Sequence, residues 1–475
     1  MQQLVLLFLV ALLLDGALCR DDDHPWSDVN QPFYEIKSGL SIPLVGYGIG
    51  NLPHAEIPYV IHDQLRRGVL LVDTAHASNN ERLIAEAVAK YDGGGIQTRG
   101  GSGSRAHAEE LAPLHVVTKV WYTHLGYERT KLSIRESLEN LSSTSPRQIY
   151  VHMLLHWPRC DDDIEWMNCE EEEHRLPQSV KDAGPPPHLD KANAFKHSWK
   201  AMEEVYAEHQ NEMLKRSQMD KITKGREEVM KSVNSKDVTP IVASIGVSNF
   251  DLEDLKELML ARHPPLIYQG SSWTAFYDPH LTSYIREHHI FYQSYAVMSI
   301  LHRRDQAPNA YRVLSDLAQD LRATVHPEDK EADLTEATVV LAYFLHKDVG
   351  VVPRAASPSH QRENSPPAVA AILPHLTVSL LEQLERAITS LLRGEDLHIS
   401  VAFTNALQLP IQIHWVHPET SEEHLVSNVI QPGNVEVQKT HPGHKFVAYD
   451  PERAIRREFV VDAAYGEHLS FAVEL

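Results

Sequence analysis

Three polar residues with complementary chemistry stand at the ends of apolar, β-prone runs. They are an acid, Asp73, an ammonium group, Lys119, and an imidazole, His156. A carboxylate keeps a neighbouring ammonium group charged, and an ammonium group lowers the pKa of a nearby proton donor. A neutral imidazole hydrogen-bonds and orients a carbonyl oxygen. Together the three residue types are suited to proton transfer at a polarised oxygen atom.

These residues need a scaffold that brings distant strand ends together. Eight apolar β-type runs recur along the chain: Ile42–Tyr47, Val69–Thr74, His115–Trp121, Ile149–His156, Ala243–Ser248, Leu266–Ser272, Ile290–Ala296 and Val349–Arg354. Amphipathic stretches such as Glu128–Leu141 and Asp251–Ala261 separate several of them. Eight β/α repeats in ~350 residues predict an α/β fold, a (β/α)₈ TIM barrel, which displays catalytic groups at the carboxyl ends of its strands.

The spacing and the flanking residues of three stretches carry a family resemblance. Val72–Glu81, Val117–Trp121 and Leu154–Pro158 together resemble the aldo-keto reductases over residues 37–394. The resemblance implies the same barrel fold independently. It also implies an oxidoreductase that reduces small aldehydes or ketones with NADP(H), using a catalytic tetrad of Asp, Tyr, Lys and His.

Three of the four tetrad positions are retained. Asp73, Lys119 and His156 match the Asp, the Lys and the His, whereas Ser78 stands where the family has its Tyr. The serine hydroxyl reaches several ångströms less far, and an alcohol is a far weaker acid than a phenol with a pKa of ~10. Loss of a general acid costs ~10²–10⁴ in rate.

Two interpretations of the altered tetrad stay open. A water molecule held by Ser78, or the side chain of His76 or Tyr122, would replace the missing proton donor in a working enzyme. Alternatively, Asp73 and Lys119 are a buried ion pair inherited from an active ancestor and kept for stability.

The resemblance assigns a nicotinamide site to separate strand ends. Ser248, Asn249 and Gln269 match family positions that hydrogen-bond the carboxamide, and Tyr295 matches the aromatic residue that stacks on the ring. Stacking with amide contacts would present one face of the ring for hydride delivery.

The adenosine end of the cofactor is assigned to the segment after the last expected strand. Arg354 replaces the usual Lys, and Glu363 and Asn364 match the adenine contacts. Ala355 has lost a hydroxyl, and His360 stands where an Arg grips the 2′-phosphate, so a weakened preference for NADPH over NADH is open.

Other cofactor and metal motifs are absent from the sequence. It contains no GxGxxG after a strand, no P-loop, no HExxH and no CxxC pair. No metal site is expected, and the remaining histidines receive no role in the barrel.

Inserts interrupt the barrel domain, which is expected over residues 30–394. They lie at residues 93–110, 159–190 and 205–238. The second follows the fourth expected strand on the active-site face, where it would either narrow the pocket or form a plain surface excursion. Its two cysteines, separated by eight residues, would close a disulfide in an oxidising compartment or remain free thiols.

A small all-β module follows at residues 398–475, where hydrophobicity alternates with period two. Its sequence resembles the von Hippel–Lindau β domain, a sandwich that binds hydroxyproline-containing peptides. Thr440, His444 and Phe446 match pocket positions of that family, while its pocket Tyr has no counterpart. The module is therefore either a peptide- or protein-binding element or a structural appendage.

The ends and the charge of the chain indicate its compartment and partners. Residues 4–14 form an apolar run too short to span a bilayer, which predicts a signal peptide over residues 1–19, with an uncleaved anchor as the alternative. The expected location is the lumen of the endoplasmic reticulum or the cell exterior. A net charge of −21 argues against nucleic acid or an anionic membrane as a partner.

Two functions therefore compete. The first is an NADP(H)-dependent reductase of small carbonyl compounds with a modified proton donor. The second is a catalytically inactive nucleotide-binding protein that acts as a scaffold through its β module. Ser78 favours the second, and the retained tetrad and cofactor residues favour the first.

Overall fold

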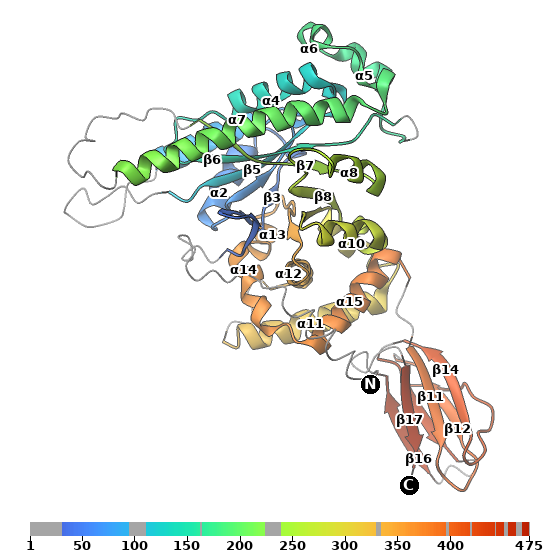
Figure 1. Ribbon diagram of the computed structural model, residues 1–475. Helices are drawn as coiled ribbons and strands as arrows, with labels where there is room; N and C mark the ends of the chain where they lie inside the picture. Colours follow the sequence, from blue (N-terminus) through green and yellow to red (C-terminus); the bar gives the residue numbers. More distant parts are fainter. Residues whose placement is uncertain are drawn as a thin grey trace, which may run out of the picture. The chain divides into compact units, whose positions relative to one another are not determined.

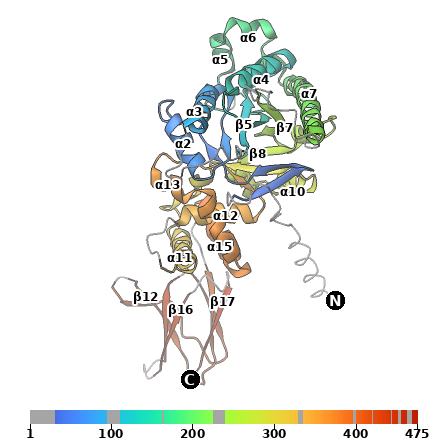
Figure 2. The same ribbon diagram turned by 90° about the vertical axis from the view of Figure 1, so that its left-hand side faces the viewer.

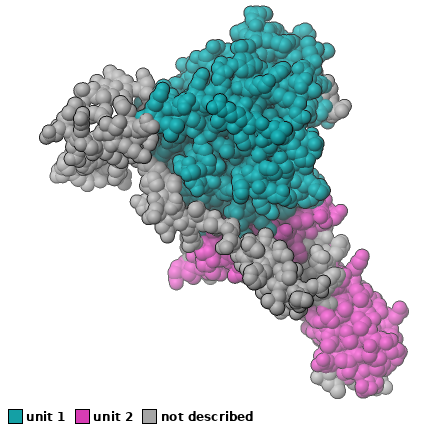
Figure 3. Space-filling model, in the orientation of Figure 1, with its two compact units in different colours: residues 1–297, 344–371 teal, residues 298–343, 372–475 magenta. Residues whose placement is uncertain are grey.

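The computed structural model describes residues 31–94, 111–161, 164–223, 239–328, 334–395, 399–418, 420–441, 443–450, 455–461 and 468–474. The chain divides into two compact units (Figure 3). Unit 1 consists of residues 1–297 and 344–371, and unit 2 of residues 298–343 and 372–475. The signal peptide expected at residues 1–19 lies outside the described residues.

An eight-stranded parallel sheet forms the centre of unit 1 and confirms the predicted (β/α)₈ barrel (Figure 1). Its strands follow one another in chain order: β3 (Tyr47–Gly48), β4 (Leu71–Asp73), β5 (Leu114–Val120), β6 (Ile149–Leu155), β7 (Ile241–Ser248), β8 (Ile267–Ser271), β9 (Phe291–Tyr295) and β10 (Gly350–Val351). All neighbouring pairs are parallel, as β/α repeats require. The longest strands, β5 to β7, are almost entirely buried because both faces of the barrel wall are covered.

The barrel closes between its first and last strands. Val45 and Val351 form a parallel bridge. Gly46 N donates to Val351 O at 2.8 Å, and Gly48 N donates to Pro353 O at 3.0 Å. Residues 44–48 and 350–353, here called the closing seam, therefore join the two ends of the sheet and remove its edges.

One expected strand is divided in the structure. The run Ile42–Tyr47 contains the end of β2 (Leu40–Pro43) and the start of β3, because Pro43 ends an antiparallel hairpin. In that hairpin β2 pairs with β1 (Phe33–Lys37). The ring of Tyr34 stacks at 4.9 Å on Phe291, the first residue of β9, so the hairpin covers the amino ends of the barrel strands.

Helices surround the barrel of unit 1 (Figures 1 and 2). They are α2 (Ile57–Arg66), α3 (Glu81–Gly94), α4 (Tyr127–Leu141), α5 (Cys169–Arg175), α6 (Gln178–Ala183), α7 (Ala194–Thr223), α8 (Leu252–Leu258), α9 (Ser272–Tyr277), α10 (Pro279–Glu287), α13 (Pro358–Glu363) and α14 (Pro366–Ile372), with the 3₁₀ turns η2 (His76–Ser78), η3 (Tyr122–His124) and η4 (Pro187–Asp190). Residues 205–223 of the charged stretch expected as an insert at residues 205–238 continue α7, and the rest of that stretch lies outside the described residues. The first turns of α7 bury Phe195, Trp199 and Met202 in the core.

The acidic insert after β6 forms α5, α6 and η4. Cys160 and Cys169 are joined by a disulfide that ties the start of α5 to the end of β6, and both residues are buried. Asn168 caps α5 by accepting a hydrogen bond from Glu171 N, and three glutamates occupy the first turn, where the helix dipole favours them. Residues 95–110 of the first insert lie outside the described part of the chain.

A polar chain crosses the barrel interior below the site. His115 Nδ1 lies 2.9 Å from His152 Nε2, and His152 Nδ1 lies 2.7 Å from Ser244 Oγ. The three residues come from β5, β6 and β7 and satisfy one another, as buried polar groups must. Burial lowers the pKa of His152 to about 3.

Unit 2 combines helices with the C-terminal strands. Its helical elements are η5 (Val297–Arg303), α11 (Pro308–Val325), most of α12 (Glu336–His346), η6 (Leu373–His375) and α15 (Val378–Arg393). Thr377 caps the start of α15, and Gly394, with φ +64°, ends it.

The expected all-β module forms two packed sheets. Its strands are β11 (Ile399–Asn405), β12 (Gln412–Val416), β13 (Glu423–Leu425), β14 (Val435–Thr440), β15 (Lys445–Tyr449), β16 (Arg456–Val460) and β17 (His468–Val473). One sheet has the order β14-β11-β17 and the other β13-β12-β15-β16. Their inner faces bury Val401, Phe403, Ile413 and Phe446, the core of a β-sandwich.

Among the described residues, no helix combines the length and the apolar character needed to cross a bilayer.

Candidate active site

The acid and the ammonium group meet at the carboxyl ends of β4 and β5. Lys119 Nζ donates to Asp73 Oδ1 at 2.6 Å and to the Thr74 carbonyl oxygen at 2.7 Å. Only 4% of the Lys119 side chain and 13% of the Asp73 side chain are exposed. A buried ion pair needs further hydrogen bonds to offset desolvation. Gln269 Nε2 supplies one, because it donates to the same carboxylate oxygen at 2.7 Å.

His156 follows β6 directly and faces the same end of the barrel. Its backbone N donates to Val120 O at 3.0 Å, and its ring meets the Trp121 indole edge-on at 4.8 Å. Burial and the neighbouring Lys119 charge hold the pKa of His156 well below its usual range. Its buried Nδ1 has no hydrogen-bond partner. The imidazole is therefore neutral at physiological pH, a state in which one ring nitrogen still carries the N–H that donates to a carbonyl oxygen.

Ser78 lies on η2, the turn that follows β4. Its backbone N donates to Ala75 O at 2.9 Å, and its Oγ lies 3.3 Å from where a side chain on Gly50 would begin. Within the described residues the hydroxyl makes no hydrogen bond, to Lys119 or to any other group. Ser78 is therefore on the turn that follows β4 and makes no hydrogen bond with the ion pair.

The two other candidate proton donors are engaged elsewhere. His76 Nε2 lies 2.9 Å from Glu136 Oε2. The Tyr122 hydroxyl donates to the Glu172 carboxylate on α5, and burial together with that carboxylate raises the pKa of Tyr122. Neither group is directed at the Asp73–Lys119 pair by these contacts.

The four expected nicotinamide residues converge from neighbouring strands. Tyr295 at the end of β9 donates from its hydroxyl to Asn249 Oδ1 at 2.6 Å, and Asn249 Nδ2 donates to Ser248 Oγ at 3.1 Å and to His156 O at 3.0 Å. Asn249 has φ 60°, a left-handed conformation that asparagine tolerates and that is held here at the functional end of β7. Burial raises the pKa of Tyr295 to about 12.

Gln293, which the sequence analysis did not single out, completes this cluster. Gln269 Nε2 donates to Gln293 Oε1 at 2.8 Å as well as to Asp73, so it joins the cofactor residues to the ion pair. Gln293 Nε2 and Ser294 Oγ are buried without a partner. Gln293 shares its strand face with Tyr295, and an unmet amide nitrogen beside an aromatic ring fits a nicotinamide ring with its carboxamide. The one signal in the sequence that could have indicated Gln293 is its place two residues before Tyr295, which puts both side chains on one face of the strand.

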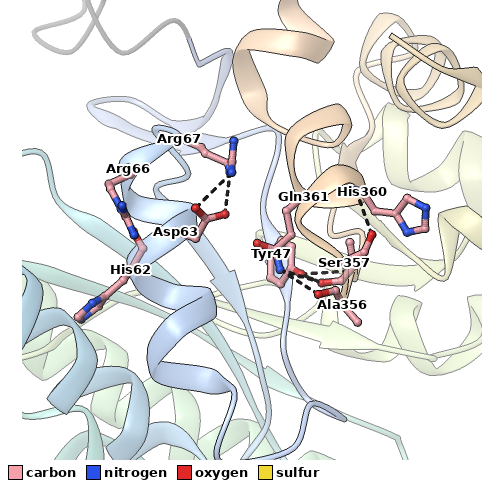
Figure 4. A network of polar contacts seen from close by, with 10 residues as sticks. Tyr47, His62, Asp63, Arg66, Arg67, Ala356, Ser357, His360 and Gln361 are labelled. Atoms are coloured by element: carbon pink, nitrogen blue, oxygen red, sulfur yellow. Dashed lines mark hydrogen bonds and ion pairs between the residues drawn. The ribbon is translucent and has the colours of Figure 1, made fainter. Parts of the chain in front are cut away.

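The segment expected to hold the adenosine end follows the closing seam (Figure 4). Tyr47 donates from its hydroxyl to the Ala355 carbonyl oxygen, and Gln361 Nε2 donates to Ala355 O and to Ala356 O, each at 3.4 Å. Ser357 caps α13 by accepting a hydrogen bond from His360 N at 3.2 Å. Tyr47 is a further anchor that the sequence did not reveal.

The charged and polar groups expected on this segment differ in exposure. Arg354 is exposed, so its guanidinium is available to a phosphate group. Glu363 is half-buried, with His360 Nε2 3.9 Å from its carboxylate. Asn364 is buried, and its Oδ1 has no partner. The segment thus fits an adenosine phosphate at Arg354 and an adenine near Asn364.

A sequence model of the aldo/keto reductase family matches residues 46–384, more than half of the chain. The chain belongs to the aldo/keto reductase family. The family match contains all of the tetrad and cofactor positions described above and ends before the C-terminal β module.

Curated relatives of this chain include proteins named as a dehydrogenase and a probable reductase. Morphine 6-dehydrogenase of Pseudomonas putida is 28% identical over 131 residues, which cover 27% of this chain and 37% of that protein. A probable NAD(P)H-dependent D-xylose reductase of Aspergillus terreus is 22% identical over 337 residues, 70% of this chain and 87% of that protein. The chain spans about two fifths of the length of several other curated relatives that it matches.

Solved structures of the family are similar to this aldo/keto reductase. The aldose reductase of Schistosoma japonicum has a TM-score of 0.47 and 20% sequence identity, and the match covers 74% of this chain and 90% of that chain.

The expected peptide-pocket residues of the β module have different surroundings. Thr440 Oγ1 lies 2.8 Å from His444 Nδ1, and Thr440 itself is buried. Phe446 is 3% exposed and packs at 5.3 Å against Phe403 in the core of the sandwich. The likeness to the von Hippel–Lindau β domain stays a prediction.

Proposed function

We propose that the chain is an NADP(H)-dependent oxidoreductase that reduces aldehydes or ketones, with Ser78 in the place of the tetrad tyrosine. One observation carries this proposal. The Lys119–Asp73 pair at 2.6 Å and the half-buried His156 imidazole share one barrel end with the nicotinamide residues, and Gln269 contacts both Asp73 and Asn249.

The cofactor, when bound, supplies a hydride to the carbonyl carbon. The first task of the protein is to position the cofactor. Tyr295 would face the ring, and Ser248, Asn249 and Gln269 would hydrogen-bond its carboxamide. Arg354 would bind the 2′-phosphate at the other end of the molecule.

At the carbonyl oxygen, the chain must stabilise developing negative charge and deliver a proton. The neutral His156 imidazole can donate a hydrogen bond to that oxygen, and the Lys119 ammonium group supplies positive charge that Asp73 keeps in place. Because His76 and Tyr122 are paired with carboxylates, a water molecule between Ser78 and Lys119 is the best-supported proton source.

The cofactor assignment is tested by titrating the full chain with NADPH and following quenching of tryptophan fluorescence. We expect saturable quenching that Tyr295→Leu weakens by about 10-fold or more, since stacking on an aromatic side chain is worth about 1–3 kcal/mol. Tyr284→Leu is the matched control, because Tyr284 stacks on His288 on α10, away from the site. No quenching at millimolar NADPH would refute the assignment.

A second candidate function follows from Ser78 and from the β module. If Ser78 leaves no turnover, the barrel would bind nucleotide while the module binds a hydroxyproline-containing peptide. Support comes from Trp415, whose ring lies 5.3 Å from His444 and whose buried Nε1 has no partner. Equal recovery of the protein on hydroxylated and unmodified proline peptides would count against recognition of hydroxyproline by the β module.

We also propose residence in the secretory pathway. The apolar run within residues 1–19 suits a cleaved signal, and the Cys160–Cys169 disulfide suits an oxidising compartment. Protease protection of the full chain in isolated microsomes tests this location, and complete digestion without detergent would exclude it.

A further inference from the structure

Two imidazoles and a carboxylate from distant parts of the chain meet beside η2. His76 is the first residue of η2, His124 is the last residue of η3, and Glu136 lies on α4. Each offers one ligand atom, and these atoms all lie within 4.8 Å of one another. His76 Nε2 is 2.9 Å from Glu136 Oε2, and the two imidazole rings are 4.9 Å apart.

The orientation of His124 leaves one nitrogen available. Its Nδ1 lies 3.0 Å from Thr123 Oγ1, while within the described residues its Nε2 has no hydrogen bond. Metal-bound histidines engage their second ring nitrogen in this way, because the outer hydrogen bond fixes the ring and its tautomer. His124 as a whole residue is 6% exposed, so packing holds it in place before any ligand arrives.

The cluster opens on a cavity with an acidic wall. The cavity has a volume of about 530 Å³, and Glu136, Glu139 and Glu172 line it together with Arg175. Arg129, which lies near His124, is neutralised by two hydrogen bonds to Glu173 at 2.8 Å. The Glu172 carboxylate already accepts hydrogen bonds from the Trp121 indole and the Tyr122 hydroxyl. Glu136 is therefore the carboxylate that faces the imidazoles.

We propose that His76, His124 and Glu136 bind a divalent cation of the zinc class, with the fourth position open to this cavity. Two imidazole nitrogens and a carboxylate oxygen suit zinc, cobalt or nickel, whereas magnesium and calcium prefer all-oxygen sites. Zinc–ligand bonds of about 2.0–2.1 Å place tetrahedral ligand atoms about 3.3 Å apart, a separation that small side-chain rotations reach from the observed cluster.

The ion would tie three separate elements together. Asp73 ends β4, and η2 carries both His76 and Ser78, so a metal at His76 fastens the turn that bears Ser78 to α4. This site lies outside the Asp73–Lys119 pair and takes no part in the proposed reduction. The cation therefore has a positional role in the loop after β4.

Zinc binding to the metal-stripped full chain, measured by isothermal titration calorimetry at pH 7, tests the proposal. We expect one equivalent of tightly bound Zn²⁺ that Glu136→Gln and His124→Gln each weaken by about 100-fold or more, because even outer-shell changes cost 10–100-fold. Bound Co²⁺ is expected to show the visible absorption of a tetrahedral site, lost in the same variants.

His424→Gln is the matched control. His424 belongs to a second group of imidazoles, around Trp415 in the β module, with a ring-to-indole distance of 5.8 Å. This variant should bind Zn²⁺ as the parent does. Absence of binding by the parent, unchanged binding by both site variants, or loss in His424→Gln would each overturn the proposal. Glu136 is 36% exposed, so Glu136→Gln is expected to fold, which circular dichroism checks.

Discussion

Ser78 places a short hydroxymethyl side chain on η2, the turn where the proposed reduction would need a proton donor. Its Oγ is near Gly50, and its hydroxyl has no hydrogen bond within the described residues. The charge that a donor requires is nevertheless present, because the Asp73–Lys119 pair is fully formed. The chemistry of the site thus depends on what connects Ser78 with Lys119.

Ser78→Tyr is expected to raise kcat/KM for aldehyde reduction by about 10²–10⁴, because it restores a phenol beside an ammonium group. The measurement is NADPH consumption with a panel of aldehydes. Ser78→Phe is the control, since it adds the same ring without the hydroxyl. Equal rates for the parent and the tyrosine variant would show that another proton source already serves the site.

Lys119→Met is expected to lower the free energy of unfolding by about 3–5 kcal/mol, since it leaves the Asp73 carboxylate buried with Gln269 as its remaining side-chain partner. Urea denaturation measures the change. The double variant with Asp73→Asn should lose less stability than Lys119→Met alone, because no charge remains to be buried. A double variant that is less stable than the single one would contradict this account.

The sequence located the site's reactive residues but not their connections. Asp73, Lys119 and His156 were recognisable because each follows an apolar run, and strand ends in a barrel converge. Gln269's second contact, to Gln293, depends on side-chain rotamers that no spacing encodes. The cluster of His124 with Glu136 was missed for a similar reason, since α4 contributes Glu136 from outside the barrel strands and leaves no metal-ligand spacing.

At the scale of elements, the β/α alternation was predictable and the boundaries were less so. The eight apolar runs all contain barrel strand residues, yet Ile42–Tyr47 is shared between hairpin and barrel because Pro43 interrupts it. The acidic insert was expected to lie on the active-site face. Its exact contacts were not predictable, because Glu172 reaches Trp121 and Tyr122 through tertiary packing alone.

Reduction of the Cys160–Cys169 disulfide is expected to loosen this insert. The cross-link closes a loop with a sequence separation of 9, for which chain entropy predicts about 2–3 kcal/mol. Limited proteolysis with and without dithiothreitol should show that reduction speeds cleavage within the insert, from Cys160 to the start of η4. Cys160→Ser should behave as the reduced protein does, and identical digestion patterns in all three samples would argue against a stabilising bond.

For the whole molecule, buried neutral histidines imply sensitivity to acid. His152 has a pKa of about 3, and the pKa of His156 is also lowered by burial. Below the unfolded value of ~6.5 the unfolded chain binds protons that the folded chain cannot, so stability falls as pH falls. Each histidine contributes up to about 1.4 kcal/mol per pH unit in that window.

Urea midpoints measured between pH 7.5 and pH 5 should therefore decrease steeply below about pH 6.5. His152→Gln should flatten the dependence, whereas replacement of the exposed His288 should not. A midpoint that stays constant or rises on acidification would contradict the neutral state of these rings.

The closing seam has a consequence for how the proposed nucleotide would leave the barrel. Strands β5 and β6 are paired over seven residues, whereas β10 pairs with β9 over two residues and with the segment before β3 through the Val45–Val351 bridge. Local opening of the sheet should begin at the closing seam, and Arg354 lies three residues after Val351. Among the barrel strands, amide hydrogen exchange should then be fastest around residues 350–353. Under the proposed cofactor assignment, Arg354 would let go of the phosphate end many times while the ion pair between Asp73 and Lys119 stays intact.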